Sequence, residues 1–297
     1  MPRQRLGQHF LSNHAWCSRI LDTLPSLPTA GSDAAGTWLE IGPGHGEMTR
    51  LLAAPGRRIV AVEADARLAA GLRERVAAEP HDWPGVEIVE ADILQFDFAR
   101  LGGERFRVYG NLPYYITSPI LHRLFERANR IASIHIVIQL EVAARIVARP
   151  GRREYGYLSV ACQFYTRPEI ALRIPAGAFR PPPRVVSALA GMTLPGERAS
   201  VAVGDECAFL RFVQGCFSQK RKTLRNNICA LPRDLGAPSA PVQRRGARNL
   251  GELEPSERDG MIRTALADCG VRPDARAEQL SISQFAALYA RLSSCAF

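Results

Sequence analysis

The sequence predicts an α/β fold in which an open parallel sheet carries helices on both faces and a small all-helical C-terminal domain follows. From about residue 38 to 190, short apolar runs alternate with segments whose apolar residues recur at helical spacing. Strict alternation of strand and helix is typical of a parallel sheet. After about residue 200 only helical spacing continues. We therefore predict two domains, at 1–195 and 200–297.

Five apolar runs have the length and composition of strands. They lie at 37–42, 58–63, 86–92, 106–111 and 133–139. The intervening stretches "GEMTRLLAA", "ARLAAGLRERVAA" and "SPILHRLFER" have the apolar spacing of helices. Ligands of open α/β sheets bind beyond the carboxyl ends of the strands. We therefore expect the functional residues just after these runs.

The C-terminal segment contains three predicted helices. The first covers 205–228 and includes the basic stretch "QKRKTLR". A Pro/Gly/Ala-rich stretch at 232–249 is predicted to be a mobile loop. Two further helices follow it, with Ser256 and Ser283 as their predicted N-caps.

Composition and charge exclude several classes of protein. The formal net charge is +9, and the only lysines are Lys220 and Lys222. A GC-rich genome would explain arginine in place of lysine but not the excess of basic residues, so a polyanionic partner is favoured. The seven scattered cysteines lack zinc-site spacing, and no signal or membrane-length apolar run is present. We predict a cytoplasmic protein with reduced thiols and no metal or membrane association.

A glycine-rich loop follows the first predicted strand. Its glycines alternate as Gly42, Gly44 and Gly46, whereas a dinucleotide fingerprint would place the third glycine where Glu47 stands. Glycines let the backbone approach a ligand closely, and the preceding acid, Glu40, suits a cationic head group. These features favour S-adenosylmethionine, a cofactor without pyrophosphate. A tight strand-to-helix turn without a ligand is the alternative.

Acidic residues follow the next two strands. Glu63, at the end of the second strand, is placed to accept hydrogen bonds from both ribose hydroxyls of a nucleoside, with Asp65 as a competing candidate. Asp92, at the end of the third, is placed to accept from an adenine amino group. Either acid alone could be a helix or turn cap. Three such features in order predict a nucleoside pocket.

The stretch "GNLPYYI" at 110–116 follows the fourth strand. An aromatic amine is a poor nucleophile, and two carbonyl acceptors on its N–H groups would help it attack a sulfonium methyl group. The side-chain oxygen of Asn111 and the backbone carbonyl of Leu112 can supply this pair. Pro113 fixes the backbone, and Tyr114 offers a ring on which a base can stack. A plain turn with core tyrosines is the alternative, and for Tyr115 we expect inward packing without chemistry.

These residues, with further motifs, resemble a known family. "RLGQHFL" (5–11), "NLPY" (111–114), "QLEVAARIVA" (139–148), "YGYLSV" (155–160), "FRPPPRVVSA" (179–188) and "SQKRKTLRN" (218–226) are similar to the ribosomal RNA small-subunit adenine dimethyltransferases. The resemblance runs from about residue 3 to 292. It implies a Rossmann-like class I methyltransferase sheet and dimethylation of two adjacent adenosines near the 3′ end of small-subunit rRNA.

The resemblance also implies roles for individual residues. Three N-terminal residues would close over the cofactor: Gln8, His9 and Leu11. The family often has asparagine where His9 stands. The other cofactor contacts would be Gly42, Glu63, Asp92 and Asn111. Phe179 would stack on the target base opposite Tyr114. The contacts to rRNA phosphates would come from Lys220, Arg221, Lys222 and Arg225.

The implied partner is small-subunit rRNA within a pre-ribosomal 30S particle, bound by a monomeric enzyme. Two other functions are alternatives. One is a related resistance enzyme, which would methylate an adenine of large-subunit rRNA. The other is a non-catalytic RNA-binding assembly or transcription factor, which would have the same fold without the activity. The "NLPYYITSP" and "FRPPPRVVSA" stretches favour the small-subunit enzyme, and the intact glycine loop and Asn111 argue against loss of catalysis.

Overall fold

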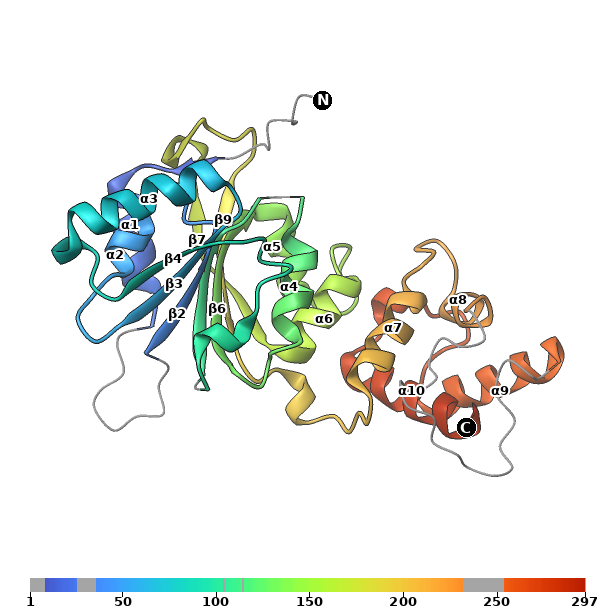
Figure 1. Cartoon of the computed structure of the whole chain (residues 1–297). Helices are drawn as coiled ribbons and strands as arrows, with labels where there is room; N and C mark the ends of the chain where they lie inside the picture. The colour runs from blue at the N-terminus through green and yellow to red at the C-terminus, as the bar shows by residue number, and fades with distance from the viewer. Residues whose placement is uncertain (1–8, 26–35, 104, 114, 232–253, 297) are drawn as a thin grey trace, which may run out of the picture. The chain divides into compact units, whose positions relative to one another are not determined.

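The computed structural model of the chain describes residues 9–25, 36–103, 105–113, 115–231 and 254–296 (Figure 1). The chain divides into two compact units, Met1–Ala144 with Thr166–Leu194, and Arg145–Tyr165 with Pro195–Phe297. The chain passes from one unit to the other after residues 144, 165 and 194, and the predicted boundary near residue 195 corresponds to the last of these points. The segment 145–165 differs from the prediction, because it joins the C-terminal helices and not the sheet.

The first unit contains a seven-stranded sheet with strand order β4-β3-β2-β5-β6-β9-β7. The five parallel strands are β2 (Thr37–Ile41), β3 (Arg58–Glu63), β4 (Val86–Glu90), β5 (Phe106–Asn111) and β6 (Ile131–Gln139). Two antiparallel strands extend the sheet at one edge, β9 (Ser187–Thr193) and β7 (Arg167–Ile174). The predicted α/β fold is confirmed, with this antiparallel extension added.

Helices cover both faces of the sheet (Figure 1). One side carries α1 (His14–Thr23), α2 (Glu47–Leu52) and α3 (Ala66–Ala78), and the other carries α4 (Thr117–Phe125) and α5 (Leu140–Val147). Short 3-10 turns lie at Pro80–Asp82, Phe98–Leu101 and Ala176–Ala178. A two-stranded ribbon, β1 (Phe10–Leu11) with β8 (Phe179–Arg180), stands apart from the main sheet.

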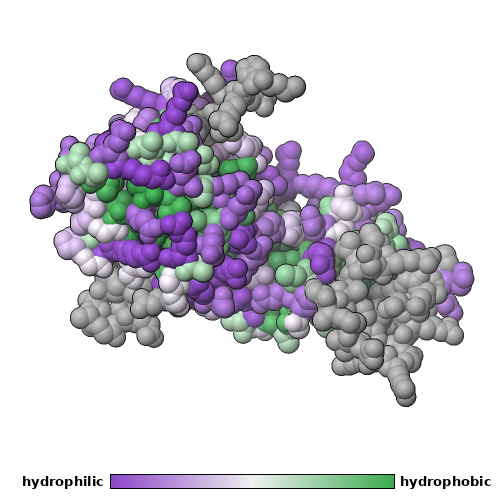
Figure 2. Space-filling view, viewed as in Figure 1, coloured by the Kyte–Doolittle hydropathy of each residue, from purple (hydrophilic) through white to green (hydrophobic). Residues whose placement is uncertain are grey.

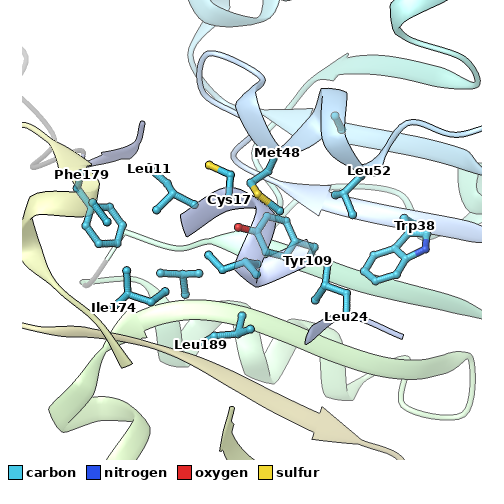
Figure 3. Close-up of a cluster of buried hydrophobic side chains, with 14 of the residues drawn as sticks. Leu11, Cys17, Leu24, Trp38, Met48, Leu52, Tyr109, Ile174, Phe179 and Leu189 are labelled. Carbon is cyan, nitrogen blue, oxygen red and sulfur yellow. The ribbon is translucent and has the colours of Figure 1, made fainter. Parts of the chain in front are cut away.

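A buried core lies between the sheet and helices α1 and α2. Trp38, Tyr109 and Leu189 from the sheet pack with Cys17 of α1 and Met48 of α2 (Figure 3). All five side chains are at most 5% exposed. Because these apolar side chains are buried against one another, they hold the sheet in a fixed position relative to the two helices.

The second unit is helical, and it differs from the prediction at its first helix. Its helices are α6 (Tyr157–Tyr165), α7 (Glu206–Cys216), α8 (Leu224–Cys229), α9 (Pro255–Asp268) and α10 (Ile282–Ala296), with 3-10 turns at Glu197–Ala199 and Ala277–Gln279. The single helix predicted over 205–228 is wrong, because residues 217–223 form a turn between α7 and α8. The buried Asn227 Nδ2 donates to the carbonyl of Cys216 (2.7 Å), and the Thr223 hydroxyl caps α8. These bonds satisfy backbone groups that each helix end leaves unpaired.

The predicted serine caps are also wrong. Glu254 precedes α9, and Ser281, two positions before Ser283, accepts from the backbone N–H of Gln284 at the start of α10. The stretch 232–249 lies outside the described residues.

The surface is largely polar on the face shown in Figure 2, with an apolar area over the first unit. In the described part of the chain, we find no helix with both the length and the apolar character needed to span a bilayer. Nor do the residues placed in the structure bring together His, Cys, Asp or Glu side chains as a metal site. No disulfide joins any of the six cysteines placed there.

Candidate active site

The glycine loop joins β2 to α2 at the carboxyl edge of the sheet. Gly42, Gly44 and Gly46 have positive φ values of 66°, 60° and 85°, a region that disfavours residues with a Cβ atom. At Gly44 a Cβ would also lie 2.8 Å from the ring of Phe10, and at Gly46 it would lie 2.6 Å from Leu72. The loop therefore combines a left-handed backbone with close packing, and both require glycine.

Glu63 ends β3 and holds this loop from the side. Its carboxylate accepts from the backbone N–H of Gly44 (3.1 Å) and from that of Asp65 (3.0 Å), and the residue is 5% exposed. The carboxylate therefore fixes the position of the loop. Asp65, the competing candidate, caps α3 by accepting from the N–H groups of Arg67 and Leu68. Asp65 is therefore a helix cap, whereas Glu63 is the acid that contacts the glycine loop.

Two buried polar atoms face the pocket formed at this edge. Glu40 and Tyr109 are paired in register on β2 and β5, each is 1% exposed, and both line the pocket. Glu40 Oε2 and the Tyr109 hydroxyl have no hydrogen-bond partner among the described residues. Burial raises the pKa of Glu40 to about 8. The pocket is lined by Phe10, Leu11, Glu40, Gly42, Pro43, Glu47, Met48, Tyr109 and Asn111.

The N-terminal segment closes one side of the pocket. β1 pairs with β8, so that Leu11 lies opposite Phe179, and the N–H of Ser12 donates to the carbonyl of Ala178 (3.0 Å). His9 contributes twice: its carbonyl accepts from Asn111 Nδ2 (2.9 Å), and its ring Nδ1 lies 2.7 Å from the carbonyl oxygen of Pro181. Gln8 lies outside the described residues.

The predicted acceptor residues lie at the end of β5. The pair Gly110-Asn111 belongs to the strand, and a Cβ on Gly110 would lie 3.0 Å from the carbonyl oxygen of Ile41. Since Asn111 Nδ2 donates to His9, its Oδ1 is the atom that can accept from a substrate amine. The N–H of Leu112 donates to the carbonyl of Val137 (3.1 Å), which fixes the start of the loop.

The stretch contains two tyrosines, Tyr114 and Tyr115. Tyr114 lies outside the described residues, so its stacking role stays a prediction. Tyr115 is 58% exposed. The expectation that it packs beneath the loop is therefore wrong. Pro113 accepts a hydrogen bond from the N–H of Ile116 (3.2 Å), and this turn carries Tyr115 on its outer side.

Two other predicted residues lie away from the pocket lining. Asp92 is exposed and lies two positions beyond the end of β4, where its Oδ1 accepts from the N–H of Leu94 (2.9 Å). Phe179 is 2% exposed and packs beside Leu11 and Ile174 in the core (Figure 3). An adenine contact for Asp92 and a stacking role for Phe179 remain predictions.

The predicted phosphate contacts belong to the second unit. Arg221 and Lys222 are exposed in the turn between α7 and α8. Lys220 Nζ donates to the carbonyl of Arg153 (3.0 Å). Arg225 differs from the rest, because its guanidinium is paired with Asp259 of α9. Phosphate contacts by these four residues remain predictions, and Arg221 and Lys222 are the two for which we expect them most.

Sequence reasoning missed several pocket residues. In the sequence Tyr109 cannot be told from an ordinary core aromatic of a strand. Its position two residues before Asn111, which places both side chains on one face of β5, is the signal that could have identified it. Met48 has the spacing of a core residue of α2. It belongs to the buried core and also lines the pocket. Phe10 lies at ring-stacking distance from His45 (4.6 Å between centroids), a contact between segments that are far apart in sequence.

The fold and the site together define a class I methyltransferase. The residues fit the methyl donor: positive-φ glycines form a cradle that a Cβ would fill, Glu63 lies at the next strand end, and the unpartnered Glu40 oxygen suits a cationic amino group. The model of the ribosomal RNA adenine dimethylase family matches residues 2–236. The chain belongs to this family, and S-adenosylmethionine is its methyl donor.

Named relatives match over nearly the whole chain. The ribosomal RNA small subunit methyltransferase A of Acidobacterium capsulatum is 38% identical over 292 residues, covering 98% of this chain and 91% of the relative. The enzyme of the same name from Geobacter metallireducens is 38% identical over 290 residues, covering 96% and 94%.

Solved structures share the fold. A dimethyladenosine transferase from Plasmodium falciparum superposes with a TM-score of 0.70 at 20% identity, covering 94% of this chain and 96% of that one. The 23S rRNA methyltransferase ErmE superposes with a TM-score of 0.62 at 26% identity, covering 95% and 99%. The likeness therefore extends over both units of the chain.

The raised pKa of Glu40 leads to a testable prediction. Near pH 7 the carboxyl is mostly protonated in the ligand-free protein, and a cationic amino group bound beside it would favour the ionised form. We expect cofactor binding to release about one proton from the wild type and almost none from Glu40→Gln. Calorimetric titrations in two buffers with different ionisation enthalpies measure this number. Equal release by both proteins would contradict the assignment.

Proposed function

We propose that this protein transfers methyl groups from S-adenosylmethionine to the 6-amino groups of two adjacent adenosines near the 3′ end of small-subunit rRNA. The single observation that carries the proposal is the placement of Asn111. Its amide is held by the His9 carbonyl at the end of β5, so that Oδ1 presents an acceptor beside the pocket that Glu40 and the glycine loop line. Family membership supplies the class of substrate.

The residues of the site support methylation of an amine. An adenine amino group has two N–H donors, and Asn111 Oδ1 with the Leu112 carbonyl offers two acceptors for them. These bonds draw electron density toward the nitrogen and favour its tetrahedral geometry. The cofactor, when bound, supplies an electrophilic methyl group. No base of high pKa is needed, because the proton can leave after the nitrogen has become positively charged.

The small subunit is favoured over the large subunit by the relatives. Two relatives named ribosomal RNA small subunit methyltransferase A are 38% identical to this chain, whereas the 23S rRNA enzyme ErmE is 26% identical. Retention of Asn111 and of the unpartnered Glu40 oxygen in the pocket disfavours a purely structural RNA-binding protein.

We further propose that the substrate is rRNA within a pre-ribosomal 30S particle, that the enzyme acts as a monomer, and that it works in the cytoplasm. The net charge of +9 suits a large polyanion. The second unit presents Arg221 and Lys222 on an exposed turn. This unit is proposed to bind rRNA, while the sheet domain carries the chemistry.

The proposed function is tested with undermethylated small subunits. We expect that incubation with the protein and S-adenosylmethionine yields N6,N6-dimethyladenosine at two neighbouring positions, located by mass spectrometry of nuclease fragments. Large subunits, incubated in parallel, should remain unmodified. Modification of the large subunit alone would overturn the choice of substrate, and no modification of either would overturn the enzymatic assignment.

The exposed turn between α7 and α8 gives a prediction about salt. Replacing Arg221 and Lys222 together with alanine should weaken particle binding and make the salt dependence shallower, by about 0.7–0.9 in the slope of log K against log salt for each lost phosphate contact. Arg225→Ala is the contrast, because Asp259 already holds this guanidinium. Filter binding at several salt concentrations measures the slopes. An unchanged slope in the double variant would exclude these contacts.

A further inference from the structure

The described residues expose three large hydrophobic side chains. Tyr115 is 58% exposed, Val185 is 43% exposed and Val186 is 45% exposed. Scattered exposed apolar residues need no explanation, but these three lie on two loops, and both loops leave the same edge of the sheet.

Strand register places the two loops near each other. Asn111, at the end of β5, pairs with Val137 of β6, and Gln139 of β6 pairs with Ser187 of β9. The N–H of Leu140 also donates to the carbonyl of Val186 (2.9 Å). The strand ends from which the two loops leave are therefore two strand spacings apart, roughly 10 Å. His9 connects the two segments, because its carbonyl accepts from Asn111 Nδ2 and its ring Nδ1 lies 2.7 Å from the carbonyl oxygen of Pro181.

The chemistry of the second loop suits nucleic acid. Residues 180–186, "RPPPRVV", present Arg180 and Arg184 as well as the two valines, and all four side chains are exposed. Neither arginine forms an ion pair with any residue that the structure describes. Such a surface suits a single nucleic-acid strand, because the arginines can contact its phosphates and the apolar side chains can contact its bases.

The opposite loop supplies an aromatic ring. The turn closed by the Pro113 carbonyl and the Ile116 N–H holds Tyr115 outward at the position after Tyr114. An exposed ring on a fixed turn is a stacking platform, because every base offers a π-face. The ring is separate from the pocket lining, so it is available to a second nucleotide while the target adenosine occupies the site.

We propose that Tyr115 stacks on the adenosine beside the one being methylated, and that the apolar and basic side chains of 180–186 form the other wall of this neighbouring-base site. This inference rests on the proposed function. It gives the two-adenosine substrate a physical basis: one adenine enters the pocket while its neighbour is held at the rim, so that the enzyme selects a pair of adjacent bases. Tyr115 is thus a specificity-determining residue that takes no part in the chemistry.

The test uses small subunits reconstituted from transcribed rRNA. One substrate has the natural pair of adenosines, and two others carry uridine, which stacks more weakly, at one or the other position. Wild type, Tyr115→Ala and Tyr115→Phe are compared by kcat and KM for the adenosine that remains. We expect Tyr115→Ala to raise the KM for the natural substrate about tenfold, with kcat and cofactor affinity within about twofold, and Tyr115→Phe to restore wild-type values.

The substrates with uridine at the neighbouring position show whether Tyr115 acts through the neighbouring base. If Tyr115 contacts that base, uridine weakens wild-type binding, and Tyr115→Ala adds little further loss on the uridine substrates. An equal tenfold loss on natural and uridine substrates would overturn the proposal, as would a wild-type KM for the natural particle in Tyr115→Ala. Failure of the wild type to methylate the natural particle would instead overturn the proposed function itself.

Discussion

Replacing Asn111 with alanine is expected to reduce the rate of methyl transfer by about 100-fold or more, the scale of loss when a preorganised polar group at a reacting centre is removed. In the proposed mechanism this side chain would supply Oδ1 as one of the two acceptors for the adenine amine, and its Nδ2 is held by the His9 carbonyl at 2.9 Å. Single-turnover rates with bound particle measure the chemical step directly. Particle affinity should change little.

Asn111→Asp is the matched control. It retains an oxygen but loses the donor to His9, so the acceptor stays while its orientation is lost. We expect a rate between those of the wild type and Asn111→Ala. A wild-type single-turnover rate in Asn111→Ala would refute the assigned role, and an equal loss in particle affinity and rate would assign the residue to binding.

Glu63→Ala is expected to raise the apparent KM for S-adenosylmethionine by about 100-fold. The 5% exposed carboxylate accepts from the N–H groups of Gly44 and Asp65, and each buried donor left without an acceptor costs about 1–3 kcal/mol. Loss of the carboxylate therefore loosens the glycine loop and removes the proposed acceptor for ribose hydroxyls. Initial rates at varied cofactor concentration measure the effect, and the KM for the particle should change far less.

Asp65→Ala separates this effect from loss of stability. Asp65 lies two positions away and caps α3 through the N–H groups of Arg67 and Leu68, so its removal should cost about 1 kcal/mol of stability. We expect a lower melting temperature with a nearly unchanged cofactor KM. Parallel increases in the KM for cofactor and for particle in Glu63→Ala would contradict a role confined to the cofactor half of the site.

Elements with local signals can be predicted from the residues alone. The strands at 58–63 and 106–111 were predicted with their observed bounds, because each is an apolar run followed by a polar residue at its end. The glycine loop is recognisable from alternating glycines after an apolar run, and the structure gives Gly42 and Gly44 the positive φ values that favour glycine. The place of Asn111 at the end of β5 was likewise predictable, and its role in the reaction stays a prediction.

Other features depend on partners that are distant in the chain, so they become visible only once the chain has folded. The antiparallel strands β7 and β9 join the sheet through pairing that no local pattern specifies. The break after α7 depends on Asn227, whose amide reaches the Cys216 carbonyl. Arg225 is held by Asp259, 34 positions away, because the folding of α8 against α9 brings opposite charges together.

The pocket illustrates the same division. Gly42 and the preceding Glu40 mark it in the sequence, whereas Tyr109 is a pocket residue only because β2 and β5 pair in register and place its ring beside Glu40. Tyr115 gave no local sign of its direction, and the turn closed by Pro113 and Ile116 decided that it faces outward. Local sequence determines which backbone shapes form, and long-range packing determines which side chains meet.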